Sequence, residues 1–187
     1  MGVSFNTVAM DHINELIEAC SARSGLTLPK LKSGLGAQGR LGFSILGLVS
    51  LGLELEGISA KAGVPVREAF WGFSASAVGL LGVASLELGP LEIYGGRGWY
   101  LAGYSESLPG RQPVRAGGLG GGFKLGVRGK LIRLGGLSLS VNLGLRRLSV
   151  PKLVDPRGNP LGACCDRPYL DFSGVELGMG IRLRWGF

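Results

Sequence analysis

Residues 173–187, SGVELGMGIRLRWGF, alternate between two kinds of side chain. From Val175 onward every odd position is large and apolar, and every even position is glycine or charged. Successive side chains of a β-strand point to opposite faces, so the stretch is predicted to be one strand with an apolar face and a glycine-rich, charged face. The period is that of a strand and not that of a helix.

The same alternation recurs upstream and predicts five further strands. They are expected in the run that starts at Leu41 and over residues 69–88, 91–104, 117–133 and 137–146. The first two runs are longer than the roughly 9–11 residues that a tilted membrane-crossing strand needs, so a further strand pair is expected within them or in residues 26–40. Turns are predicted at Gly89-Pro90 and at 134–136, and long loops at 105–114 and 149–172. The total favoured is eight strands.

Two local features of the strand at 91–104 are also predicted. Gly95-Gly96 is expected to host a β-bulge, because glycine tolerates the backbone that a bulge requires. The aromatic residues of this strand are candidates for a membrane-interface girdle, with ordinary packing as the alternative. They are Tyr94, Trp99, Tyr100 and Tyr104.

Residues 1–40 differ from the rest and are predicted to form a separate amino-terminal helix and linker, with the barrel over 41–187. A helix is expected at residues 8–21, capped by Asn6 or Thr7, with Ile13, Leu16, Ile17 and Cys20 along one stripe. Residues 26–40 contain a proline, lysines and glycines and are interpreted as a linker or a weak strand.

The carboxy-terminal motif Val175-x-Leu177-x-Met179-x-Ile181-x-Leu183-x-Trp185-x-Phe187 resembles the closing strand of bacterial outer-membrane β-barrel proteins. The resemblance covers about residues 41–187. It is to the general class of small barrels, such as the membrane domain of outer-membrane protein A. It implies an all-β, antiparallel up-and-down transmembrane β-barrel in the bacterial outer membrane, in contact with membrane lipid. It also implies that Trp185 and Phe187 form the assembly signal read by the barrel-assembly machinery.

Composition excludes several other classes. Hydrophobic residues make up 45% of the chain, too many for disorder, yet no apolar run approaches the 18 residues of a helical membrane span. The formal charge of +7 is not gathered into a Lys/Arg-rich block, so nucleic acid is not an expected partner. The lone His12 and the three cysteines, Cys20, Cys164 and Cys165, form no metal-ligand pattern, and no metal or other cofactor is predicted. Asp155, Asp166 and Asp171 could hold a cation, although polar loops often carry such residues without binding one.

If the apolar faces contact lipid, the opposite faces fill the lumen with acids and bases in nearly equal number. Buried charges are costly unless paired, so these side chains are expected to form a charge network that makes a plug instead of a pore. Arg182 is expected to pair with Glu54, Glu56 or Glu176. A conducting or ligand-binding lumen is the alternative. The predicted network is Glu54, Glu56, Glu87, Glu92, Lys124, Arg128, Lys130, Arg146, Glu176, Arg182 and Arg184.

The function favoured is that of a small, closed, monomeric barrel with a structural or surface-interaction role and no catalysis. Residues 1–24 lack the pattern of a secretory signal, which implies a mature or mis-started sequence if the membrane interpretation holds. The same feature motivates the alternative of a soluble all-β structural subunit of viral or phage type. A lipid-modifying barrel enzyme is the third hypothesis, without a catalytic constellation in the sequence to support it.

Overall fold

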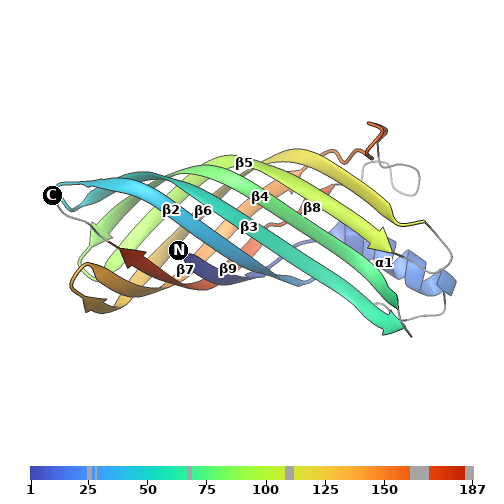
Figure 1. The fold of residues 1–187 in the computed structure, drawn as a ribbon, viewed down its shortest axis with the longest axis horizontal. Coiled ribbons are helices and arrows are strands. Elements are labelled where there is room, and N and C mark those ends of the chain that lie inside the picture. Colours follow the sequence, from blue (N-terminus) through green and yellow to red (C-terminus); the bar gives the residue numbers. More distant parts are fainter. Residues whose placement is uncertain (25–26, 28, 67–68, 108–111, 161–168, 184–187) are drawn as a thin grey trace.

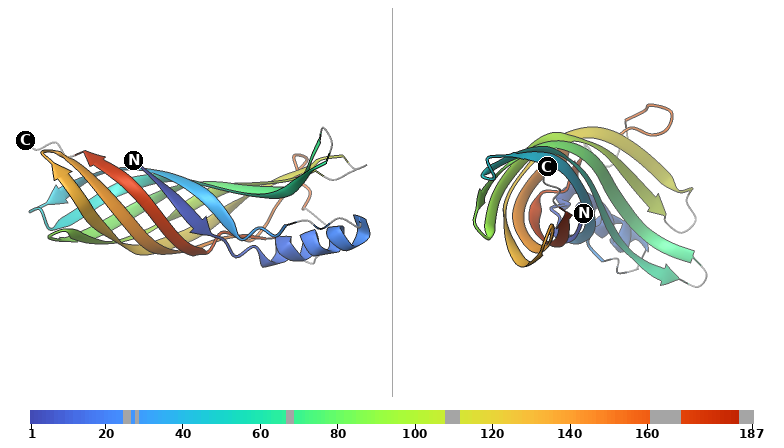
Figure 2. Two further views of the ribbon diagram at one scale, coloured as in Figure 1. Left: turned by 90° about the horizontal axis from the view of Figure 1, so that it is seen from below. Right: turned by 60° about the vertical axis from the view of Figure 1, so that its left-hand side comes forward.

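The computed structural model describes residues 1–24, 27, 29–66, 69–107, 112–160 and 169–183, and they form a closed antiparallel β-barrel (Figures 1 and 2). Eight strands make the wall, and the two-residue strand β8 pairs with the end of β7 in the same register as β9, so it continues the line of the closing strand. No helix in this part of the chain is long and apolar enough to cross a membrane. The elements are β1 (Gly2–Thr7), α1 (Asp11–Ser24), β2 (Ser33–Ile45), β3 (Val49–Val66), β4 (Ala69–Leu88), β5 (Leu91–Ser107), β6 (Val114–Leu134), β7 (Leu137–Val150), β8 (Leu170–Asp171) and β9 (Gly174–Leu183).

The first and last wall strands close the barrel. β1 pairs with both β2 and β9, and β9 pairs with β7. The stagger of the barrel can be measured by passing from each residue to its paired residue on the next strand. Starting at Leu35 of β2, this path crosses all eight strands and reaches β2 again at Ile45, ten positions further along the chain. Such a stagger accompanies the tilt that closure requires, and eight strands enclose a lumen that side chains can fill.

Short turns connect the strands at one end of the barrel, which we call the turn side. Gly89, with a φ of 62°, begins the Gly89-Pro90 turn, and Gly135, with a φ of 57°, begins the turn between β6 and β7. Glycine adopts this left-handed backbone without a steric penalty. Both turns were predicted. A further turn lies inside the run that starts at Leu41, where Leu46 and Gly47 have φ of 52° and 69° and separate β2 from β3.

The predicted boundary between an amino-terminal segment and a barrel at residue 41 is wrong in the structure. β1 and the first half of β2 belong to the wall, and Asn6 and Thr7 are strand residues instead of helix caps. The helix begins at Asp11, later than predicted. β1 has six residues, too few for alternation to stand out, and its inward positions include Ser4 and Asn6. β1 is a strand because it pairs with β2 and β9, and the β9 partner is distant in the sequence.

Two predictions about β5 are also wrong. Its pairing with β4 and β6 runs without interruption through Gly95 and Gly96, and the irregularity lies in β6 between Lys130 and Ile132. Tyr94, Tyr100 and Tyr104 are buried, so they do not form a girdle, whereas Trp99 is exposed on the outer face. Alternation explains the difference, because the even-numbered tyrosines share the face of Glu92 and Trp99 does not.

The polarity of the two wall faces reverses along the long strands. Between the turn side and mid-strand, outward residues are apolar and inward ones polar; on β3 these are Leu53 and Glu54. Further along β3, Ser59 and Lys61 face outward, while Ile58, Ala60 and Ala62 face inward. We call this second end the loop side. β3, β4 and β5 extend past β1 and β2 there and reach over α1 (Figure 1).

Candidate functional site

The lumen is the candidate site, and its charges form two groups at different depths. The turn-side cluster comprises Arg40, Glu87, Glu92, Arg128, Lys130 and Arg182. The central cluster comprises Glu54, Glu56, Lys124, Arg146 and Glu176. Each member faces inward because it lies on the face of its strand opposite the large exposed apolar residues, which is the odd-numbered face on β4 and the even-numbered face on the other strands.

Glu92 is the centre of the turn-side cluster. It is fully buried, and the guanidinium groups of Arg40, Arg128 and Arg182 all reach it, the first two at 3.1 and 3.4 Å. Glu87 accepts hydrogen bonds from Lys130 Nζ at 2.6 Å and from Arg182 at 3.2 Å. The four cations come from three strands: Arg40 from β2, Arg128 and Lys130 from β6, and Arg182 from β9. These pairs therefore join distant parts of the wall across the lumen.

Arg146 is the centre of the central cluster, with no exposed side-chain area. Its guanidinium pairs with Glu56, donates to the side chain of Asn6, and donates through Nε to the Phe172 carbonyl at 3.3 Å. Glu176 lies 3.9 Å from it and accepts a hydrogen bond from Asn142 at 2.7 Å. Arg146 thereby connects β7 to β1, β3, β9 and the segment before β9.

Lys124 occupies the other side of the central cluster. It pairs with Glu54, lies 3.7 Å from Glu56 and donates to the Gln38 side chain at 3.1 Å. Tyr100 donates its hydroxyl hydrogen bond to Glu56 at 2.8 Å. Tyr94 lies between the two clusters, with Lys124 and Arg128 at 5.8 and 5.1 Å from its ring centre. An aromatic face attracts cations at such distances, so Tyr94 links the two groups.

Beyond the central cluster the lumen becomes apolar and α1 closes it. Ile13 and Ile17 of the helix are buried in the same hydrophobic core as Ile58, Phe73 and Phe172. Many of the wall residues that face this core are alanines, which leave room for a helix. They are Ala60, Ala62, Ala75, Ala77, Ala102 and Ala116.

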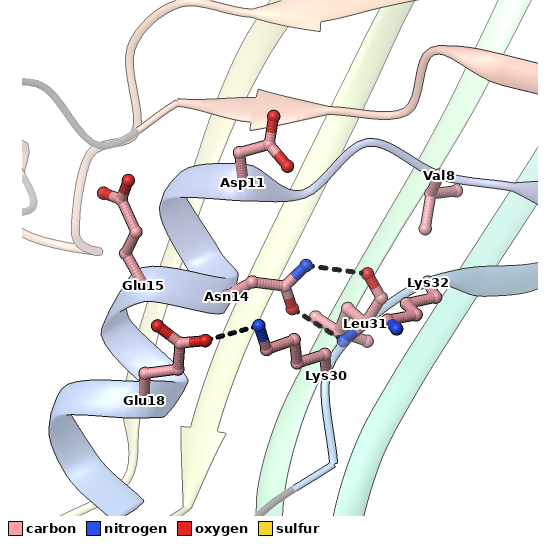
Figure 3. A pocket seen from close by; sticks show the side chains of 8 residues that line it. All are labelled: Val8, Asp11, Asn14, Glu15, Glu18, Lys30, Leu31 and Lys32. Atoms are coloured by element: carbon pink, nitrogen blue, oxygen red, sulfur yellow. Dashed lines mark hydrogen bonds and ion pairs between the residues drawn. The ribbon is translucent and has the colours of Figure 1, made fainter. Parts of the chain in front are cut away.

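Hydrogen bonds fix the segment that returns from α1 to β2 (Figure 3). The Asn14 side chain donates to the Leu31 carbonyl at 3.1 Å and accepts from the Leu31 N–H at 2.7 Å. Glu18 and Lys30 form an exposed ion pair beside it. The pocket drawn there lies between α1 and residues 30–32 and is lined by both signs of charge.

The structure brings ten of the eleven predicted lumen residues into these two clusters, and Arg184 lies outside the described residues, as do Trp185 and Phe187. Sequence analysis missed Arg40, because residues 26–40 were interpreted as linker. The expected partners of Arg182 were wrong, since it pairs with Glu87 and Glu92. Glu54, Glu56 and Glu176 belong to the other cluster.

The described part of the long loop shows local hydrogen bonding at two of the three aspartates. Asp155 accepts hydrogen bonds from the N–H groups of Arg157 and Asn159, and Asp171 accepts one from the Ser173 N–H. Asp166, Cys164 and Cys165 lie outside the described residues. Within the described ranges, no group of three or more His, Cys, Asp or Glu side chains is placed to hold a metal ion.

No protein-family model matches the chain, and no curated protein does. A solved structure does: the crystal structure of Neisserial surface protein A superposes with a TM-score of 0.55 at 13% sequence identity. The match covers 98% of this chain and 94% of that one.

The chain has the fold of a small outer-membrane β-barrel. Because the match extends over nearly the whole of both chains, it includes β1 and the closure of the wall as well as the long strands. This confirms the predicted fold class, an antiparallel eight-stranded barrel with a short amino-terminal helix. At this identity the likeness concerns architecture, and the lumen residues described above are properties of this chain.

Proposed function

We propose that this protein is a small outer-membrane barrel with a structural or surface-interaction role, whose lumen is sealed by the two charged clusters and by α1. One observation carries the proposal. The paired row that passes once around the wall consists entirely of outward, exposed apolar side chains. They are Leu35, Phe5, Leu177, Leu143, Val127, Ile93, Leu86, Val49 and Ile45.

The rest of the outer wall supports an apolar band of limited height. Leu41 is 81% exposed and Leu101 69%, values that would be unfavourable in water for so many large side chains. The band ends on the loop side, where outward positions become polar at Ser59, Ser76 and Arg115. A lipid bilayer requires this arrangement of an apolar belt bounded by polar surface.

Arg97 is an outward cation within this band. It lies opposite Gly82 on β4 and Phe123 on β6. The neighbouring glycine leaves room for the aliphatic stem of arginine, which can extend along the wall so that the guanidinium approaches the headgroups. The loop-side border is a few residues away along β5, beyond Leu101.

The direction of insertion follows from the loops. In outer-membrane barrels short turns face the periplasm and longer loops face outward. We therefore place α1 and the described residues that follow β7 on the exterior, where the polar outer surface of β3–β6 also projects. This exterior end is the surface available for interaction, and the filled lumen opposes a role in conduction. The site holds no arrangement in the described residues that supports catalysis.

The proposal is tested by solubility and gel mobility. Purified protein should remain folded only in detergent or lipid, and unheated samples should migrate differently from boiled ones because the closed barrel resists denaturation. A folded monomer in plain buffer would contradict the membrane assignment and favour the soluble structural subunit. The migration of the unheated sample also shows whether the folded protein is a monomer, as expected.

We further propose that Trp185 and Phe187 are read by the barrel-assembly machinery. Deleting Phe187 should lower the amount of assembled protein in cells far more than it lowers the stability of protein refolded in detergent, because the other apolar residues of the closing strand still contact the detergent. Equal losses in the two assays would indicate a packing role alone. Replacing Phe187 with tyrosine is the matched control and should preserve assembly, since a terminal aromatic remains.

A further inference from the structure

The two lumen clusters carry opposite excess charge. Among the described residues the turn-side cluster holds four cations, Arg40, Arg128, Lys130 and Arg182, and two carboxylates. The central cluster holds two cations, Lys124 and Arg146, and three carboxylates. The lumen is therefore positive toward the turn side by two formal charges and slightly negative deeper inside.

The excess positive charge is partly enclosed and still reachable. The side chains of Arg40, Arg128, Lys130 and Arg182 are 14, 12, 17 and 22% exposed, whereas Glu92 beneath them is fully buried. Uncompensated charge in surroundings of low dielectric constant is costly, and an anion of matching geometry would relieve that cost. Each guanidinium has five N–H donors in a planar fork. The two oxygens of Glu92 cannot use the donors of three such groups.

We propose that the turn-side cluster is an oxyanion-binding site, open to the turn-side mouth of the barrel and suited to a phosphate or carboxylate group. Arginine forks bind such groups with paired hydrogen bonds, and Lys130 adds a further charge. Ser50, whose hydroxyl lies 3.5 Å from Glu87, contributes a polar lining. The ligand enters from the turn side, because α1 and the apolar core close the other end.

Arg128 is the residue whose replacement is expected to weaken anion binding without unfolding the barrel. Its pair with Glu92, at 3.4 Å, is longer than that of Arg40, and Glu92 keeps both Arg40 and Arg182 when Arg128 is removed. Arg128→Gln should therefore fold and lose affinity for the anion. Lys130→Gln is a second variant of the same kind, since Glu87 retains Arg182. Arg157→Gln removes the same charge from an exposed position in the long loop and is the matched control.

The test is isothermal titration of the refolded barrel in non-ionic detergent with inorganic phosphate, at constant ionic strength against chloride. Wild type and Arg157→Gln should bind equally, and Arg128→Gln and Lys130→Gln should each bind at least about tenfold more weakly, which corresponds to one lost charge-assisted hydrogen bond. A parallel titration with an anionic phospholipid in the micelle identifies the source of the phosphate group. Binding of the lipid alone, lost in Arg128→Gln, assigns the site to a headgroup.

The proposal is overturned if folded wild type binds neither probe, or if Arg128→Gln and Lys130→Gln both bind with the affinity of wild type. Heat-modifiable mobility of each variant shows that it is folded before titration. The same gel reports on the barrel itself, so failure of the anion site is distinguishable from failure of the membrane assignment.

Discussion

Replacing Leu53 with arginine should lower the free energy of unfolding of the barrel in lipid by about 2–4 kcal/mol. Leu53 is 59% exposed on the outer face of β3, with Leu51 and Leu55 on either side of it on that face. A charged side chain there must lie in hydrocarbon or distort its surroundings to reach water. The measurement is the free energy of unfolding in bilayers by denaturant titration.

Ser59→Arg is the matched control for this change. Ser59 lies on the same strand and the same face as Leu53, beyond the loop-side end of the apolar band. An added arginine at that level has access to headgroups and water, so the expected cost is about 0–1 kcal/mol. If Leu53→Arg and Ser59→Arg lowered the free energy of unfolding equally, the two positions would not differ in their access to water, and the apolar band would not lie in lipid.

Arg146→Met should destabilise the barrel by about 3–5 kcal/mol, the usual cost of removing one partner from a buried ion pair. Methionine approximates the length of the arginine stem but leaves Glu56 and Glu176 with Lys124 as their remaining cation in the central cluster. The bonds to Asn6 and to the Phe172 carbonyl are lost as well. Unfolding in lipid or detergent at neutral pH measures the effect.

Arg182→Met provides the comparison for Arg146→Met. Arg182 also contacts two carboxylates, but its side chain is 22% exposed and both acids keep other cations, Glu92 through Arg40 and Glu87 through Lys130. Its removal should therefore cost clearly less than that of Arg146. If the two substitutions cost the same, or if Arg146→Met is neutral, the central cluster does not stabilise the barrel.

Sequence alone predicted most of β4, β5, β6, β7 and β9, but neither the amino terminus nor the division between β2 and β3. β4 was predicted from its first residue to its last, because Val78, Leu80, Leu86 and Leu88 share one face and Gly89-Pro90 marks its end. β1 was assigned to a helix and linker, since a six-residue strand lacks that statistical weight. Its identity depends on partners at both ends of the chain, β2 and β9, which only closure of the barrel brings together.

For the site, sequence could predict which residues face inward but not which of them pair. Inward placement follows from a period of two and holds for Glu54, Lys124 and Arg146 alike. Pairing depends on the stagger between strands, which separates Arg182 from Glu56 and brings it to Glu87 and Glu92. Arg40 has the same inward period as its neighbours, and a strand assignment for residues 33–45 would have identified it.

The most direct test of the membrane-spanning barrel is a depth profile of spin labels along the outer face of β3. After Cys20, Cys164 and Cys165 are replaced by serine, single labels at Leu51, Leu53, Leu55, Ser59 and Lys61 would be compared in bilayers for collision with oxygen and with a polar nickel complex. Oxygen should dominate at the three leucine positions, and the polar reagent should dominate at Ser59 and Lys61. Equal access of the polar reagent to all five labels would contradict the account.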